Sequence, residues 1–146
     1  MTGYKAYRGN QIEGAGPMGL VLLTYDALNK SLGRARLAIE SNNLVQEGEQ
    51  TGRALEAIIE LSSSLNVEDG GEVAINLGRL YSYMIEVLTK KICSGSTEGV
   101  DEVMMLAQTL HEGWKELANQ QEKKQARAVR PQMSSSMGQA AMAYGL

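Results

Sequence analysis

The chain has 146 residues, a formal net charge of −3 and one cysteine. A chain of this length fits one domain and buries roughly two-thirds of its unfolded surface, so its fold needs no covalent or metal staple. The lone Cys93 excludes an internal disulfide, and we expect it to be a small apolar filler near a helix end. The acidic pI of about 5.2 argues against a general nucleic-acid binder, which needs a basic face.

The sequence also argues against membrane insertion. It contains no run of 18 or more apolar residues, the length at which a membrane-spanning helix is considered. Residues 1–16 lack the basic start and the apolar stretch of a signal peptide. We therefore expect a cytoplasmic protein.

Apolar residues recur at helical spacing between the two prolines, Pro17 and Pro131. The first helix is expected to begin at Pro17, because the missing N–H of proline costs nothing at the first helical position. It is expected to end near 41–43, where Ser and Asn side chains compete for the backbone. Its apolar stripe comprises Val21, Tyr25, Leu28, Leu32, Ala35 and Ile39.

The second helix is expected over 44–65, and its stripe comprises Ala54, Ile58, Leu61 and Leu65. The strongest turn signal in the chain, Asp69-Gly70-Gly71, follows it. We therefore expect the third helix to begin at Gly71 or Glu72, where an acidic residue suits the positive end of the helix dipole.

The third helix carries two apolar rows, so it is either central in the fold or carries a partner site. One row comprises Val73, Leu77, Leu80, Met84 and Val87, and the other comprises Tyr81, Ile85, Leu88 and Ile92. The fourth helix is expected after a cap at Ser96 or Thr97. Its stripe comprises Val100, Val103, Ala107, Leu110, Trp114 and Leu117.

Short loops between long helices make neighbouring helices antiparallel, so the predicted fold is all-α, an antiparallel up-down four-helix bundle formed by residues 17–118. Residues 1–16 are expected to pack on the bundle as a short segment, because Tyr4, Tyr7 and Ile12 are too apolar for an idle tail. Residues 119–146 are expected to extend the fourth helix and then to form a disordered tail, rich in Ser, Ala, Met, Gln and Gly.

Catalytic chemistry finds little support in this sequence. The only histidine, His111, is expected to be a partly exposed surface residue beside the Leu110 stripe. A di-iron bundle needs Glu-x-x-His pairs on two helices, and position 108 holds Gln108. Cys93 and His111 come from different helices and lack the third orienting group of a nucleophilic site. We predict a binding protein that is not an enzyme and has no catalytic residue, cofactor or metal.

Two sequence motifs resemble those of a known family. Residues 16–26 read GPMGLVLLTYD, and residues 70–84 read GGEVAINLGRLYSYM. These resemble the signatures of the flagellin export chaperones known as FliS: a Ser-Pro followed by a Leu-rich turn and Tyr/Phe-Asp-Gly, then Gly-Gly-Glu and Leu-Tyr-x-Tyr-Met. Residues 34–43, 101–103 and 112–115 also resemble the family at corresponding places. Gly16 and Ala27 depart from the pattern, where the family has serine and glycine.

The resemblance implies a cytosolic helical bundle that binds the disordered C-terminal segment of flagellin. Such a chaperone prevents premature polymerisation and assists delivery to the flagellar export apparatus. By this resemblance we expect partner contacts from apolar and aromatic residues in or near the motifs. They are Tyr4, Tyr7, Met18, Leu22, Tyr25, Tyr81, Tyr83 and Met84.

Several alternatives remain open from the sequence. The chain is also compatible with a regulatory adaptor that binds an anti-sigma factor or an export-gate protein, and with a bundle that only homodimerises through its third helix. Its oligomeric state is expected to be a monomer or a weak homodimer. The segment with Tyr4 and Tyr7 either covers an apolar groove removably, packs on the core permanently, or contacts the partner directly.

Overall fold

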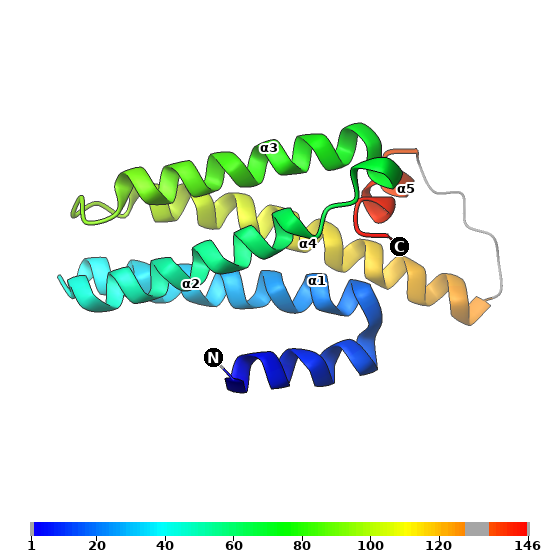
Figure 1. The fold of residues 1–146 in the computed structure, drawn as a ribbon, viewed down its shortest axis with the longest axis horizontal. Helices are drawn as coiled ribbons and strands as arrows, with labels where there is room; N and C mark the ends of the chain where they lie inside the picture. The colour runs from blue at the N-terminus through cyan, green and yellow to red at the C-terminus, as the bar shows by residue number, and fades with distance from the viewer. Residues whose placement is uncertain (1, 128–134, 146) are drawn as a thin grey trace.

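A computed structural model describes residues 2–127 and 135–145, with side-chain surroundings for 16–124 and 139–145. All regular structure in these residues is helical (Figure 1). The helices are α1 (Thr2–Glu40), α2 (Leu44–Ser63), α3 (Val67–Lys91), α4 (Glu98–Arg127) and α5 (Ser135–Met142).

The four long helices form the predicted antiparallel bundle. Successive helices run in alternating directions (Figure 1). α1 packs against α2 and α4, and α3 closes the bundle with less extensive contacts to the same two helices. We call the end with the α1–α2 and α3–α4 loops the Cys93 end, and the end with Pro17, the α2–α3 turn and α5 the Tyr144 end.

The predicted apolar stripes form the core, with one shift of phase. All six stripe residues of α1 are buried, and so is the α4 stripe except for Leu110, which is partly buried. On α3 the buried residues are Gly70, Ala74, Tyr81, Met84 and Leu88. The face of α3 that enters the core therefore lies between the two expected rows, with Met84 from the first row and Tyr81 and Leu88 from the second, whereas Ile92 of the second row is exposed.

A short helical turn precedes the third helix that the sequence predicted, and α3 comprises both. The turn starts at Val67, where the Asn66 side chain caps it by accepting the Asp69 N–H at 3.1 Å. Gly71 has a non-helical conformation with φ 55° and ψ −132°, which glycine adopts without steric cost. Gly71 therefore separates the short turn from the long part of α3, which starts at the predicted position, Gly71 or Glu72.

The N-terminal segment is helical and bends at Gly16. The backbone of α1 starts at Thr2, and Gly16 interrupts it with φ 69° and ψ −166°. Pro17 then opens the second part of α1, as the sequence indicated. Figure 1 shows the chain turning back at this kink. Whether residues 2–15 pack on the bundle stays a prediction, since their side chains lie outside the described ones.

The prediction of a disordered tail was wrong for residues 135–145. The expected extension of α4 is present to Arg127, and 128–134 lie outside the described residues. α5 follows at Ser135–Met142 and packs against α3. Composition alone missed this because Ala141 and Ala143, which suit many conformations, are buried against the bundle.

Cys93 does not fill the core. It is exposed and follows the C-cap residue Ile92 with a positive φ of 61°. Its backbone N–H donates to the buried Glu47 carboxylate at 2.9 Å. The expectation of an apolar filler was wrong because the backbone at this position, rather than the thiol, makes the contact.

Candidate partner-binding surface

Three tyrosines from distant parts of the chain, one of them in the turn after α5, bring their hydroxyl groups together inside the bundle. The hydroxyl oxygens of Tyr25 on α1 and Tyr81 on α3 lie 2.5 Å apart, and those of Tyr81 and Tyr144 lie 2.7 Å apart. Tyr25 and Tyr81 are fully buried. Buried hydroxyls need hydrogen-bond partners, and these three satisfy one another.

These phenols are held in their neutral form. Burial raises the pKa of Tyr25 to about 12, although its hydrogen bond with Tyr81 acts in the opposite direction. Burial is also the main cause that raises the pKa values of Tyr81 and Tyr144. Near pH 7 the cluster therefore offers neutral hydroxyls for packing and hydrogen bonding, and no phenolate that could act as a base.

His111 lies beside this cluster, and its expected surface position was wrong. The side chain is buried, stacks on the Tyr25 ring with centroids 5.7 Å apart, and receives the Asn29 amide at Nδ1 at 3.2 Å. Burial is the main cause that lowers the pKa of His111. His111 is thus a packed core histidine, with Leu110 beside it more exposed than the stripe indicated.

The structure divides the predicted contact residues into three groups. Tyr25, Tyr81 and Met84 are fully buried, and Met18 is nearly so. Leu22 is half-buried, and Tyr83 is 44% exposed with its hydroxyl donating to Glu102. Tyr4 and Tyr7 lie on the helical backbone before Gly16, outside the described side chains. In this conformation Tyr83 and Leu22 are accessible to a partner, whereas the buried set supports the fold around them.

Other apolar side chains besides Tyr83 are exposed on the bundle, and these were not predicted as a site. Val45 on α2 is 78% exposed and Met105 on α4 is 64% exposed. Val45 and Met105 lie outside the apolar stripes of their helices. The sequence signal that identifies them is a large apolar side chain at a position between stripe residues. The described large apolar residues that are exposed are Leu37, Leu44, Val45, Ile59, Val67, Ile75, Tyr83, Ile92, Met105 and Met142.

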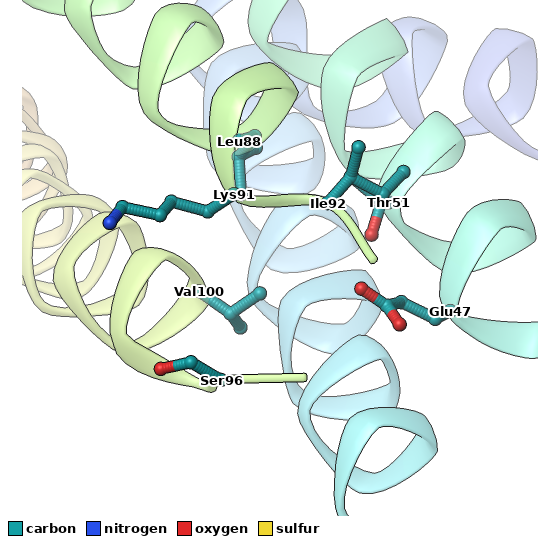
Figure 2. A pocket seen from close by; sticks show the side chains of 7 residues that line it. All are labelled: Glu47, Thr51, Leu88, Lys91, Ile92, Ser96 and Val100. Atoms are coloured by element: carbon teal, nitrogen blue, oxygen red, sulfur yellow. The ribbon is translucent and has the colours of Figure 1, made fainter. Parts of the chain in front are cut away.

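A small pocket lies at the Cys93 end, between the start of α2, the end of α3 and the start of α4 (Figure 2). Glu47 and Thr51 line one side, and Leu88, Lys91, Ile92, Ser96 and Val100 complete it. Figure 2 shows the Lys91 side chain extending away from Glu47. Because the Glu47 carboxylate binds the Cys93 N–H, its role here is to hold the α3–α4 loop against α2.

The described residues contain neither a metal-binding cluster nor a helix that could cross a membrane. None of their His, Cys, Asp and Glu side chains gather in threes in a way that could hold a metal ion. Among the described helices, none combines the length and the apolar character that a membrane crossing needs.

Comparison with known proteins places these features in a family. Residues 1–121 match the model of the flagellar protein FliS. The flagellar secretion chaperone FliS of Salmonella typhimurium is 34% identical over 122 residues, which cover 80% of this chain and 90% of the relative. FliSB of Pseudomonas aeruginosa, also a flagellar secretion chaperone, is 36% identical over 104 residues, covering 71% and 82%. FliS of Bacillus subtilis is 30% identical over 121 residues, covering 83% and 89%.

Proposed function

Because this chain belongs to the FliS family, a family of flagellar secretion chaperones and not of enzymes, we propose that it binds the disordered C-terminal segment of flagellin in the cytoplasm. Binding keeps flagellin from polymerising prematurely and assists its delivery to the flagellar export apparatus. The chemistry required is reversible association, and no bond in either protein is made or broken.

The distribution of exposed apolar residues is the observation that supports this proposal. They occur on all four long helices, from Leu37 on α1 and Val45 on α2 to Tyr83 on α3 and Met105 on α4. Apolar side chains spread in this way suit a partner that wraps around the bundle rather than one that fills a single cleft. A disordered segment can cover such a surface, and ordering it costs about 2–5 kcal/mol of the gross interaction energy.

This mode of binding explains how a small bundle can block polymerisation. A segment that makes helical contacts only in the filament carries exposed apolar residues while the subunit is free. The bundle offers those residues apolar surface and thereby occupies the contacts that the filament would use. Flagellin bound in this way stays monomeric and its C-terminal segment is not permanently folded, which is compatible with later export.

Co-elution in size-exclusion chromatography tests the proposal. The full chain is expected to co-elute with intact flagellin and not with flagellin that lacks its C-terminal segment. It is also expected to delay filament growth from added seeds with intact flagellin, and not with the truncated form. Val45→Glu combined with Ile59→Glu should weaken binding by about tenfold or more if these side chains contribute 1.4 kcal/mol or more. Glu56→Gln, an exposed polar change on the same helix, is the matched control.

Two results would contradict the proposal. One is equal co-elution of intact and truncated flagellin, which would place the contact elsewhere on flagellin. The other is failure to bind flagellin together with capture of an export-gate component or an anti-sigma factor, which would make the chain a regulatory adaptor.

A further inference from the structure

The C-terminal residues 139–145 occupy a pocket at the Tyr144 end of the bundle. The ring of Tyr144 packs edge-on against Trp114 of α4, with centroids 5.2 Å apart. Its hydroxyl lies 2.7 Å from that of Tyr81 and donates to the Leu61 carbonyl at 3.2 Å. Figure 1 shows α5 beside the beginning of α3. One aromatic side chain of the tail thus connects α2, α3 and α4.

The backbone of the tail fits against a glycine. A Cβ atom placed on Gly70 would lie 2.6 Å from the Cα atom of Ala143, closer than real side chains approach. Ala143 is fully buried and Ala141 is nearly so, whereas Met142 between them is 43% exposed. The pocket therefore accepts a helical turn whose small residues face inward and whose large residue faces solvent.

Two polar contacts in the pocket use main-chain groups at helix ends. The backbone N–H of Asn66, which precedes α3, donates to the Ala143 carbonyl at 2.7 Å. The Leu61 carbonyl lies in the last turn of α2, where helix carbonyls lack intrahelical donors, and the Tyr144 hydroxyl reaches it. Groups of this kind recognise a peptide by its backbone and by one hydroxyl, and do not require this particular sequence.

The tail fills the pocket incompletely and is weakly helical by itself. Beside Tyr144 a hollow of about 80 Å³ continues, partly open to solvent and lined by Leu20, Val21 and Leu61 among others. α5 has only 8 residues, below the roughly 12–15 at which an isolated helix becomes marginally stable in water. A longer segment could make contacts that the tail does not make.

The residues that form the pocket lie within the part of the chain that matches the family model, whereas the tail that occupies it does not. Leu61, Gly70, Tyr81 and Trp114 all lie within residues 1–121, which match the family model, whereas 139–145 lie beyond it. The receiving surface is thus part of the shared bundle, and the segment seated on it belongs to a region outside the matched part of the chain.

We propose that residues 139–145 are an internal competitor, and that the pocket they occupy is a docking site for a helical turn of flagellin with small residues on one face and an adjoining aromatic residue. The proposal rests on the proposed function, because it names flagellin as the partner. The partner displaces Tyr144 and extends into the adjoining hollow. The apparent affinity for the flagellin segment equals the affinity of the open pocket multiplied by the fraction of chaperone molecules in which the tail is unseated.

Two native reporters follow the displacement in the full chain. Trp114 is the single tryptophan, so its fluorescence reports on the loss of the Tyr144 ring. The amide of Asn66 reports by hydrogen exchange on the loss of the Ala143 carbonyl. On addition of the flagellin C-terminal segment, Trp114 emission should change and exchange at 139–145 should accelerate, while core amides of the bundle become slower.

Substitutions in the tail give the affinity test without altering the bundle. Ala143→Leu cannot seat against Gly70 and should bind the flagellin segment about tenfold more tightly if the tail is unseated in about one molecule in ten of the unchanged chain. Tyr144→Phe, which loses the hydroxyl contacts alone, should have a smaller effect in the same direction. Met142→Leu, at the exposed neighbouring position, should bind like the unchanged chain.

The outcomes separate this proposal from the proposed function. If all chains bind the segment equally and residues 139–145 stay protected in the complex, the competition is refuted and the proposed function stands. If no chain binds the segment, the proposed function fails and flagellin is excluded from the pocket as well. If Trp114 emission of the free chain changes with protein concentration, the tail seats in a second copy and the internal competitor is refuted.

Discussion

The hydroxyl of Tyr81 lies at the centre of the tyrosine cluster, so its removal provides a specific test of the fold. In Tyr81→Phe the ring remains, and both hydroxyl contacts, at 2.5 Å to Tyr25 and 2.7 Å to Tyr144, are lost. Tyr144 keeps the Leu61 carbonyl as a partner at 3.2 Å, whereas the fully buried Tyr25 hydroxyl loses its contact with Tyr81. The perturbation therefore removes hydrogen bonds without creating a large cavity.

The expected cost follows from those contacts. Each hydrogen bond contributes about 1 kcal/mol net. Tyr81→Phe removes two of them, while Tyr25 keeps its side-chain hydrogen bond with Trp114 and Tyr144 keeps the Leu61 carbonyl. We expect Tyr81→Phe to lower the free energy of unfolding by about 2 kcal/mol. Tyr83→Phe is the matched control on the same helix, because its hydroxyl binds Glu102 at an exposed site and should change stability by at most about 0.5 kcal/mol.

Urea unfolding at pH 7, followed by circular dichroism, measures both variants. The midpoint should fall for Tyr81→Phe with an unchanged slope, which would show that the folded and unfolded states keep their compactness. A midpoint for Tyr81→Phe equal to that of Tyr83→Phe would refute the reasoning, since the buried hydroxyls would then be satisfied in some other way.

Three further predictions address the core, pH and the N-terminal segment. Trp114→Ala should destabilise the fold by about 3–5 kcal/mol, and Leu110→Ala by less, because Leu110 is only partly buried. If urea unfolding showed the larger loss of stability for Leu110→Ala, the helical phase of α4 described above would be wrong. The lowered pKa of His111 means that the unfolded state binds its proton more readily, so stability is present above pH 6.5 and falls as the pH drops below it. His111→Gln should show a smaller loss of stability between pH 7 and pH 5 than the unchanged chain, and an equal loss in thermal melts would exclude His111 as the cause. Deleting residues 1–12, with Tyr4 and Tyr7, should preserve or strengthen binding of a flagellin peptide if the segment is a removable cover, whereas weaker titration by a chain still folded by circular dichroism would make it part of the site.

The helices that bury one regular stripe could be predicted from the sequence. The stripe of α1 from Val21 to Ile39 is buried throughout, because helical spacing of large apolar residues has few other solutions. On α4 the same reasoning placed Leu110 inward, yet His111 enters the core beside Tyr25. The polarity of imidazole predicts a surface position, but His111 is buried beside Asn29 of another helix, a partner that no local pattern reveals.

Two other differences arise from contacts between distant parts of the chain. The Gly70-Gly71 pair interrupts α3, as its composition predicts, but Gly70 is also the close-approach site for Ala143, 73 residues further along the chain. The tail has the composition of a disordered segment, yet Tyr144 finds its ring and hydroxyl partners on α2, α3 and α4. Local propensity carries no information about such partners, so both features required the folded structure.

The candidate site was predicted less completely than the fold. The resemblance directed attention to Tyr25, Tyr81 and Met84, which the structure places in the core. Exposed residues such as Val45 and Met105 stand outside both motifs and outside the stripes, so neither the resemblance nor the periodicity selected them. Tyr83 is the predicted residue that is both within a motif and well exposed, and it remains the best single position at which to probe partner contact.

Isothermal titration of the flagellin C-terminal segment into the full chain tests the central claim most directly. The account predicts saturable binding at about one segment per chain, with a negative heat-capacity change, because apolar surface is buried when the segment orders on the bundle. A scrambled segment of the same composition should give no saturable heat. Absence of binding across micromolar concentrations, with the bundle still folded by circular dichroism, would contradict the account.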